Sequence, residues 1–329
     1  MTQTPAIFYD AYRDLAARRL FWITLILSAV AIGGFGMLGV SKGSLDFLTY
    51  HLDTRPFDAH GLYISIFSNV VIGFWLTWIA VALALVSTAG IFPDLLVSGT
   101  IDLYLARPMG RLRFFLTKYL SGLLFAALQV GVFALGSFLV LGIRGKVWQP
   151  SLFLAIPLVV CAFSYLFAIC VVLGVWTRST IGALMLTLLI WGMYSGLFWA
   201  DQKIFDWMLE ARSMSPGNQA AVQGDKTVDA IDRFVRVALV PMPKIVPTTR
   251  LLDRWIQKKS DIMIALGLPS SDDDTGWRFG PRVQASDADR EEAYSRATGG
   301  DPAYTLGSSL IFEAVFVGLA AWIFCRRDY

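Results

Sequence analysis

The sequence predicts an all-α fold, a polytopic membrane protein with six transmembrane helices, an N-terminal interfacial helix and a large external loop before the last span. Hydrophobic residues make up 56% of the 329 residues and charged residues only 16%, whereas a soluble domain has about 45–50% apolar and about 25% charged residues. The apolar residues also gather in uncharged blocks of about 20 residues, the length that crosses a bilayer as a helix. A net charge of +3 without long basic runs argues against a nucleic-acid partner.

The apolar blocks set the expected spans and the division of the chain. They are residues 21–40, 62–90, 119–143, 152–176, 181–200 and 303–324. The first is too long for the apolar core of a secretory signal peptide and has no small-residue cleavage site, so we expect an uncleaved anchor. The chain therefore divides into residues 1–200 with the N-terminal helix and five spans, an external subdomain at 201–302, and residues 303–329 with the last span and a cytoplasmic tail.

Lys and Arg are distributed unevenly among the short segments that flank the spans, and this bias sets orientation. With the N-terminus inside, ten of them face the cytoplasm and four lie in the two short outer loops. The ten are Arg13, Arg18, Arg19, Arg107, Arg111, Arg113, Lys118, Arg178, Arg326 and Arg327, and the four are Lys42, Arg55, Arg144 and Lys146. The sequence thus predicts a multi-pass protein of the cytoplasmic (inner) membrane with both termini in the cytoplasm.

Two regions outside the spans show helical spacing. Ile7, Phe8, Ala11 and Leu15 predict an amphipathic helix that contacts membrane lipid at the inner interface, with a solvated extension as the alternative. In the external segment, apolar residues at intervals of three and four predict two amphipathic helices, over 228–239 and 251–256. We expect this pair to lie on the outer end of the bundle.

The segment between the second and third spans has the pattern of a short helix at the inner surface. Pro93 suits a first helical turn and Asp94 the positive end of the helix dipole. Pro108 forces the chain out of the helix, and the residue before it is also restricted. We expect a helix over 93–105 whose exposed apolar residues need a partner, because an isolated helix of about a dozen residues is marginal in water.

This segment resembles the corresponding part of the permease subunits of ABC-2 type ABC transporters. The match consists of Gly99, Thr100, Leu103, Leu105, Pro108, Arg111 and Lys118, in an order that includes Arg-Pro-Met-Gly-Arg. The resemblance implies that 93–105 is a coupling helix docking on a separate ABC ATP-binding subunit. It also implies a second permease subunit, in a homodimer or heterodimer, and export as the usual direction. External helices that close the outer mouth of the path are a further implication, with ordinary packing of a subdomain as the alternative.

The chain has no nucleotide-binding loop of its own. Its one Gly-Lys pair is Gly145-Lys146, and Val140 stands where the first glycine of G-x-x-x-x-G-K would be. We therefore expect the chain not to be an enzyme and to carry no cofactor or metal, with ATP and Mg on the partner ATPase.

Glu313 is the one charged residue near the middle of a predicted span. A carboxylate there must face the bundle or a wet cavity, because facing lipid costs several kcal/mol. It is a substrate contact, a proton carrier or a hydrogen-bonded packing residue. With Gln129, for which we expect an interhelical hydrogen bond, it forms the candidate transport path. An ion-coupled secondary transporter that uses Glu313 is the alternative to the permease.

Overall fold

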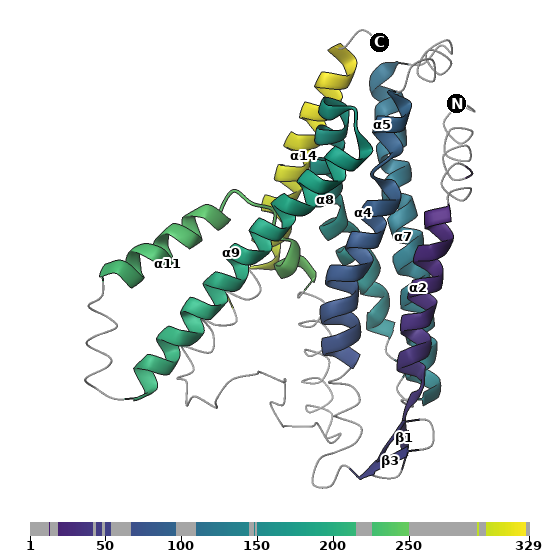
Figure 1. Ribbon diagram of the computed structural model, residues 1–329, viewed down its shortest axis with the longest axis vertical. Helices are drawn as coiled ribbons and strands as arrows, with labels where there is room; N and C mark the ends of the chain where they lie inside the picture. Colours follow the sequence, from purple (N-terminus) through teal and green to yellow (C-terminus); the bar gives the residue numbers. More distant parts are fainter. Residues whose placement is uncertain are drawn as a thin grey trace.

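The computed structural model is a bundle of helices with a small sheet at one end (Figure 1). It describes residues 13, 19–41, 44–47, 50–53, 67–96, 110–144, 148, 150–214, 226–249, 295 and 301–326. The predicted interfacial helix at 7–15 and the external helix at 251–256 lie outside these residues.

Helices account for most of the described chain. They are α2 (Arg19–Gly36), the π-helical η1 (Phe67–Ala80), α4 (Val81–Thr88), α5 (Ile91–Leu95), α7 (Arg111–Arg144), the 3-10 turn η2 (Pro150–Leu154), α8 (Ala155–Thr177), α9 (Thr180–Met214), α11 (Lys226–Leu239) and α14 (Pro302–Arg326). The strands β1 (Leu38–Ser41), β2 (Ser44–Phe47) and β3 (Tyr50–Asp53) follow α2.

Five helical stretches in the described part are long and apolar enough to cross a membrane. They are Phe74–Leu95, Arg111–Arg144, Leu152–Thr177, Thr180–Phe205 and Pro302–Arg326. The prediction of a helical, polytopic integral membrane protein is confirmed at this level. The first predicted span, 21–40, is shorter than expected: its apolar helix covers Trp22–Gly36, and the chain enters β1 at Leu38.

Helix α8 lies at the centre of the bundle. Its apolar window is 78% buried, against 22% for that of α14. It packs against α7, α9 and α14, and also contacts α4 and α5. A helix surrounded on all sides is apolar around its whole circumference, which agrees with its large buried residues, among them Phe163, Tyr165 and Phe167.

The predicted boundary at residue 200 does not coincide with a helix end. Helix α9 continues beyond it to Met214. The sequence from 197 to 215 contains no Gly or Pro, and Pro216-Gly217 follows directly. Hydropathy predicts where the apolar, membrane-spanning segment ends, whereas Gly and Pro predict where the helix ends. Here the apolar segment ends near residue 200 and the helix ends at Met214.

The chain after α2 forms a three-stranded antiparallel sheet in the order β1-β2-β3, which the sequence analysis did not anticipate. Its register pairs apolar residues with one another: Leu38 with Phe47, Val40 with Leu45, and Leu45 with Leu52. Alternating apolar and polar residues over four positions are the sequence pattern of such strands.

The two ends of the bundle have different contents. Helix α5, the start of α7 and the end of α14 lie together at one end, and the sheet lies at the other (Figure 1). We call these the α5 end and the sheet end. At the sheet end, Arg144 Nε donates a hydrogen bond to the Gly36 carbonyl over 2.9 Å, which joins the end of α7 to the end of α2.

Candidate functional site

Helix α5 packs against the bundle, and most of its side chains are buried. Ile91, Phe92, Pro93 and Leu95 are buried. Pro93 lies against Gly174 of α8, where an added Cβ would come within 3.1 Å of the proline Cγ. Asp94 is exposed and accepts a hydrogen bond from the Thr180 hydroxyl at the start of α9, over 3.3 Å. The start of this segment therefore contacts both α8 and α9.

The prediction of an exposed helix over 93–105 is corrected at its beginning. The helix starts earlier, at Ile91, and ends at Leu95. Pro93 is buried because the small Gly174 allows close approach, so it belongs to the bundle and not to a docking surface. The predicted first-turn acid is in place at Asp94. The remaining residues of the motif up to α7 lie outside the described residues; they are Gly99, Thr100, Leu103, Leu105 and Pro108.

The other end of the same segment is attached to α14. Arg111, the first residue of α7, donates a hydrogen bond from Nη1 to the carbonyl of Cys325 over 3.3 Å. The carbonyls at a helix C-terminus are unpaired and carry partial negative charge, so a guanidinium is favourable there. Lys118, two turns further along α7, is 4% exposed, so it belongs to the interior of the bundle.

A polar cluster surrounds Glu313 where α14 meets α7 and α8. The Tyr119 hydroxyl on α7 lies 2.8 Å from Oε1 of Glu313, and the Ser164 hydroxyl on α8 lies 2.7 Å from Oε2. The Ser164 hydroxyl is also 2.8 Å from the Cys161 carbonyl, and the Tyr119 hydroxyl is 3.3 Å from the Ser164 carbonyl. Glu313 is half-buried, and Tyr119 is 6% exposed. Each carboxyl oxygen thus has a hydroxyl neighbour on a different helix.

Aromatic rings hold the Tyr119 side chain in place. Its ring stacks on that of Phe167, with centroids 5.2 Å apart, and Phe167 stacks on Phe163 at 5.3 Å. Gly122, one turn after Tyr119, leaves room for Phe167: a Cβ there would lie 2.7 Å from the ring. The hydroxyl that contacts Glu313 therefore sits on a ring with little freedom to move.

The polar face of α14 extends from Glu313 toward the helix start. Thr305 and Ser309 precede Glu313 at intervals of four residues, and both are buried. The backbone N–H of Lys244 donates to the Ser309 hydroxyl over 3.0 Å. The Lys244 ammonium lies 3.5 Å from the ring centroid of Tyr304, and burial lowers the pKa of this lysine.

The sequence analysis singled out Glu313 but missed its partners. The spacing of Thr305, Ser309 and Glu313 could have indicated one polar face on the last span, since residues four apart are neighbours on a helix. Ser164 and Tyr165, adjacent polar residues in an otherwise apolar span, were a second indication. The Tyr165 hydroxyl lies close to that of Ser309 but meets hydrogen-bond geometry with no described atom.

Gln129 forms no interhelical hydrogen bond with any described residue, in contrast to our expectation. Its side chain on α7 is 1% exposed, and neither amide atom has a hydrogen-bond partner within the described ranges. The structure therefore does not bring Gln129 together with Glu313 by any hydrogen bond. An unpaired amide in an apolar interior costs about 1–3 kcal/mol.

The amphipathic helix predicted at 228–239 is present as α11, and it contacts α9, to which it is inclined (Figure 1). Val235 and Asp232 are buried, whereas Ile231, Phe234 and Val237 are more than half exposed. Its apolar face is thus only partly covered. Its position beside α9 differs from the expected seat on the end of the bundle.

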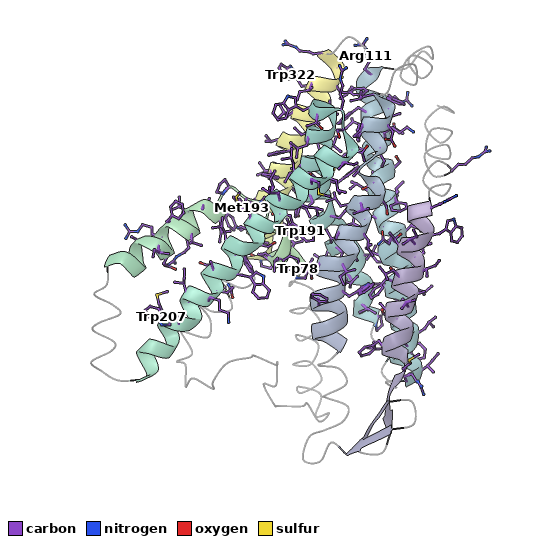
Figure 2. The ribbon with its side chains drawn as sticks, viewed as in Figure 1. Trp78, Arg111, Trp191, Met193, Trp207 and Trp322 are labelled. Atoms are coloured by element: carbon purple, nitrogen blue, oxygen red, sulfur yellow. The ribbon has the colours of Figure 1, made fainter. Side chains whose placement is uncertain are left out.

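Trp78 on η1 and Trp191 on α9 face one another (Figure 2). Met193 and Trp207 also lie on α9. The two indole rings of Trp78 and Trp191 stack with centroids 5.3 Å apart.

Within the described ranges, no group of three or more His, Cys, Asp or Glu side chains could hold a metal ion. Comparison with protein-family models, with curated proteins and with solved structures finds no match to this chain.

Proposed function

We propose that this chain is the membrane-spanning permease subunit of an ATP-driven transporter of the ABC-2 type, coupled to a separate ATP-binding subunit. The observation that carries the proposal is the attachment of both ends of the motif segment 97–109. On one side Pro93 and Asp94 contact α8 and α9, and on the other Arg111 contacts the last turn of α14. The motif itself, Gly99 to Lys118, supplies the resemblance to the family.

These attachments give the segment a mechanical role in the proposal. A partner that binds 97–109 and moves it would pull on α8 and α9 through Pro93 and Asp94, and on α14 through Arg111. Packed side chains and hydrogen bonds of this kind can carry coupling between distant sites. ATP and Mg would be held by the partner, because the sequence has no G-x-x-x-x-G-K.

A second permease subunit completes the proposed transporter. Gly192 and Gly196 form a G-x-x-x-G on α9, and both are exposed with no atom within 4 Å of an added Cβ. Small residues at this spacing let membrane helices approach closely, and no described residue packs against these two positions. Export remains the proposed direction.

Co-purification with the ATP-binding subunit tests the proposal. Tagged chain is expressed in its native host, extracted in detergent and recovered on the tag, and the ATP-binding subunit that co-purifies with it is quantified. Leu103→Asp and Leu105→Asp should each lower recovery of the ATPase at least tenfold, because a carboxylate in an apolar docking face must be desolvated.

A matched control separates docking from general damage. Trp207 is 50% exposed near the far end of α9, well away from Arg111 (Figure 2), so Trp207→Asp places the same charge on an apolar surface elsewhere in the molecule. Its recovery of the ATPase should equal that of the wild type. If Leu103→Asp and Leu105→Asp also leave recovery unchanged, segment 97–109 is not the docking site.

The Glu313 cluster favours a second candidate, an ion-coupled secondary transporter. A carboxyl flanked by hydroxyls from two other helices resembles a site where an ion could bind inside the bundle. Transport that continues after ATP depletion but stops when the proton gradient is collapsed would favour this candidate over the permease.

A further inference from the structure

The exposed side chains of α11 divide into an apolar side and a charged side. Val235 and Leu239 face the bundle, since Val235 is buried and Leu239 packs against the buried core. Angles round the helix are measured from Val235. With 3.6 residues per turn, Ile231, Phe234 and Val237 lie at about 40°, 100° and 160°, all in one direction. Each of the three is more than half exposed, so the described residues leave a continuous apolar sector of α11 uncovered.

The other side of α11 is charged. Asp232, Arg236 and Arg233 lie at about 60°, 100° and 160° in the opposite direction. Arg236 forms an ion pair with Asp232 one turn before it, and Arg233 is exposed. Arg233 and Val237 are therefore neighbours where the charged side meets the apolar side. This division, with a cation at its boundary, is typical of helices that lie in a membrane interface.

Two pairs of a cation and an aromatic ring lie near the ends of α14. The Arg326 guanidinium is 4.6 Å from the ring centroid of Trp322. The Lys244 ammonium is 3.5 Å from that of Tyr304. Both aromatic side chains are 54% exposed, and Trp and Tyr with Lys and Arg gather at the two surfaces of a bilayer. Along the helix the two rings are about 27 Å apart, close to the thickness of the hydrocarbon core, about 30 Å. The pairs therefore indicate where the two membrane surfaces cross α14.

Helix α11 ends at the level of one of these surfaces. Its last residue, Leu239, comes shortly before Lys244, whose backbone N–H donates to the Ser309 hydroxyl on α14. Figure 1 shows α11 strongly inclined to the long axis of the molecule. Its 14 residues give a length of roughly 21 Å, which is too short to cross a bilayer. The helix therefore has the position of a surface helix at the level of Tyr304.

We propose that α11 is a lipid-binding helix that lies in the membrane interface at the level of Tyr304. Ile231, Phe234 and Val237 contact acyl chains, because burial of apolar surface away from water is favourable. Arg233, at the edge of that sector, contacts headgroup phosphates. A cation is attracted most strongly to lipids with a net negative charge, so anionic lipid is the preferred partner. The proposal goes beyond the permease function and does not depend on it.

Photochemical cross-linking of the chain in its native membranes tests the proposal. The photoreactive residue p-benzoylphenylalanine replaces Phe234, and mass spectrometry of the intact protein identifies the captured molecule, which should be a phospholipid. The same residue in place of Ile311, which is 68% exposed within the last span, is the positive control. In place of Arg236, on the charged side of α11, it should capture about tenfold less lipid, because this side faces water. Only variants that elute as the wild type does on size-exclusion chromatography are compared.

Lipid preference tests the role of Arg233. In nanodiscs with equal amounts of phosphatidylglycerol and phosphatidylcholine, adducts at position 234 should favour the anionic lipid by about twofold or more. Arg233→Gln should bring the two adducts toward equal amounts, whereas Arg326→Gln, at the opposite end of α14, should leave the excess unchanged. Equal amounts of the two adducts with Arg233 in place would overturn its role.

Two outcomes of the cross-linking would overturn the proposal as a whole. One is capture at position 234 of a second copy of this chain, or of another protein, without any lipid adduct. The other is equal capture of lipid at positions 234 and 236, since lipid would then not distinguish the apolar side of α11 from the charged side.

Discussion

Gly122→Ala should destabilise the bundle by crowding the rings that position Tyr119. The added methyl group would lie 2.7 Å from two carbons of the Phe167 ring and 3.3 Å from Ile91. Phe167 is 1% exposed and is stacked between Tyr119 and Phe163, so it has no free space to move into. Crowding of this kind in a packed interior costs about 1–3 kcal/mol.

Gly131→Ala on the same helix is the matched control. There the new methyl group would lie 3.9 Å from its nearest neighbour, on Ile156, which is an ordinary contact. Both substitutions gain the preference of alanine for helix, about 0.5–1 kcal/mol, so this gain cancels in the comparison. The free energy of unfolding of Gly122→Ala should therefore fall about 1–3 kcal/mol below that of Gly131→Ala.

The assay is denaturant titration of each purified variant in mixed micelles, followed by circular dichroism. Equal stability of the two alanine variants would refute the reasoning, since it would mean that Phe167 yields without cost.

Four other variants have expected outcomes. Gln129→Leu should raise the free energy of unfolding by about 1–3 kcal/mol in the same titration, because it removes an amide without a described partner; a loss of stability would indicate that the amide is satisfied. Arg111→Ala should cost about 0.5–1.5 kcal/mol through its lost bond to the Cys325 carbonyl and should lower transport more than ATPase binding, as measured in proteoliposomes. Gly192→Leu and Gly196→Leu should leave the fold of the single chain unchanged, because an added Cβ meets no described atom, but each should lower the amount of the proposed dimer measured by size-exclusion chromatography; an unchanged amount of dimer would exclude this face.

Much of the helical plan could be predicted from the sequence because lipid imposes it. A span must be about 20 apolar residues long and must satisfy its own backbone hydrogen bonds, so hydropathy alone located the five long helices. The helical periodicity of apolar residues predicted α11. The same criterion misplaced the end of α9, which depends on Pro216-Gly217 and not on polarity. It also overlooked β1 to β3, whose pattern is short and alternating.

The motif segment shows a different limit. Its residues predicted a helix at the surface, and the first-turn acid Asp94 is where the pattern placed it. The burial of Pro93 could not be predicted, since it depends on Gly174, which lies far along the chain and has no large side chain in the way. Close approach of this kind is a property of two helices together, whereas a periodic pattern describes one helix at a time.

Glu313 separates what the sequence determined from what only the tertiary structure decided. The sequence determined that a carboxyl stands within a span and that Thr305 and Ser309 share its helical face, because helical periodicity is local. The structure decided that α8 is the central helix, and that Ser164 on it and Tyr119 on α7 meet the two carboxyl oxygens. Those contacts span 149 and 194 residues. They are set by how three helices pack, which no local sequence pattern records.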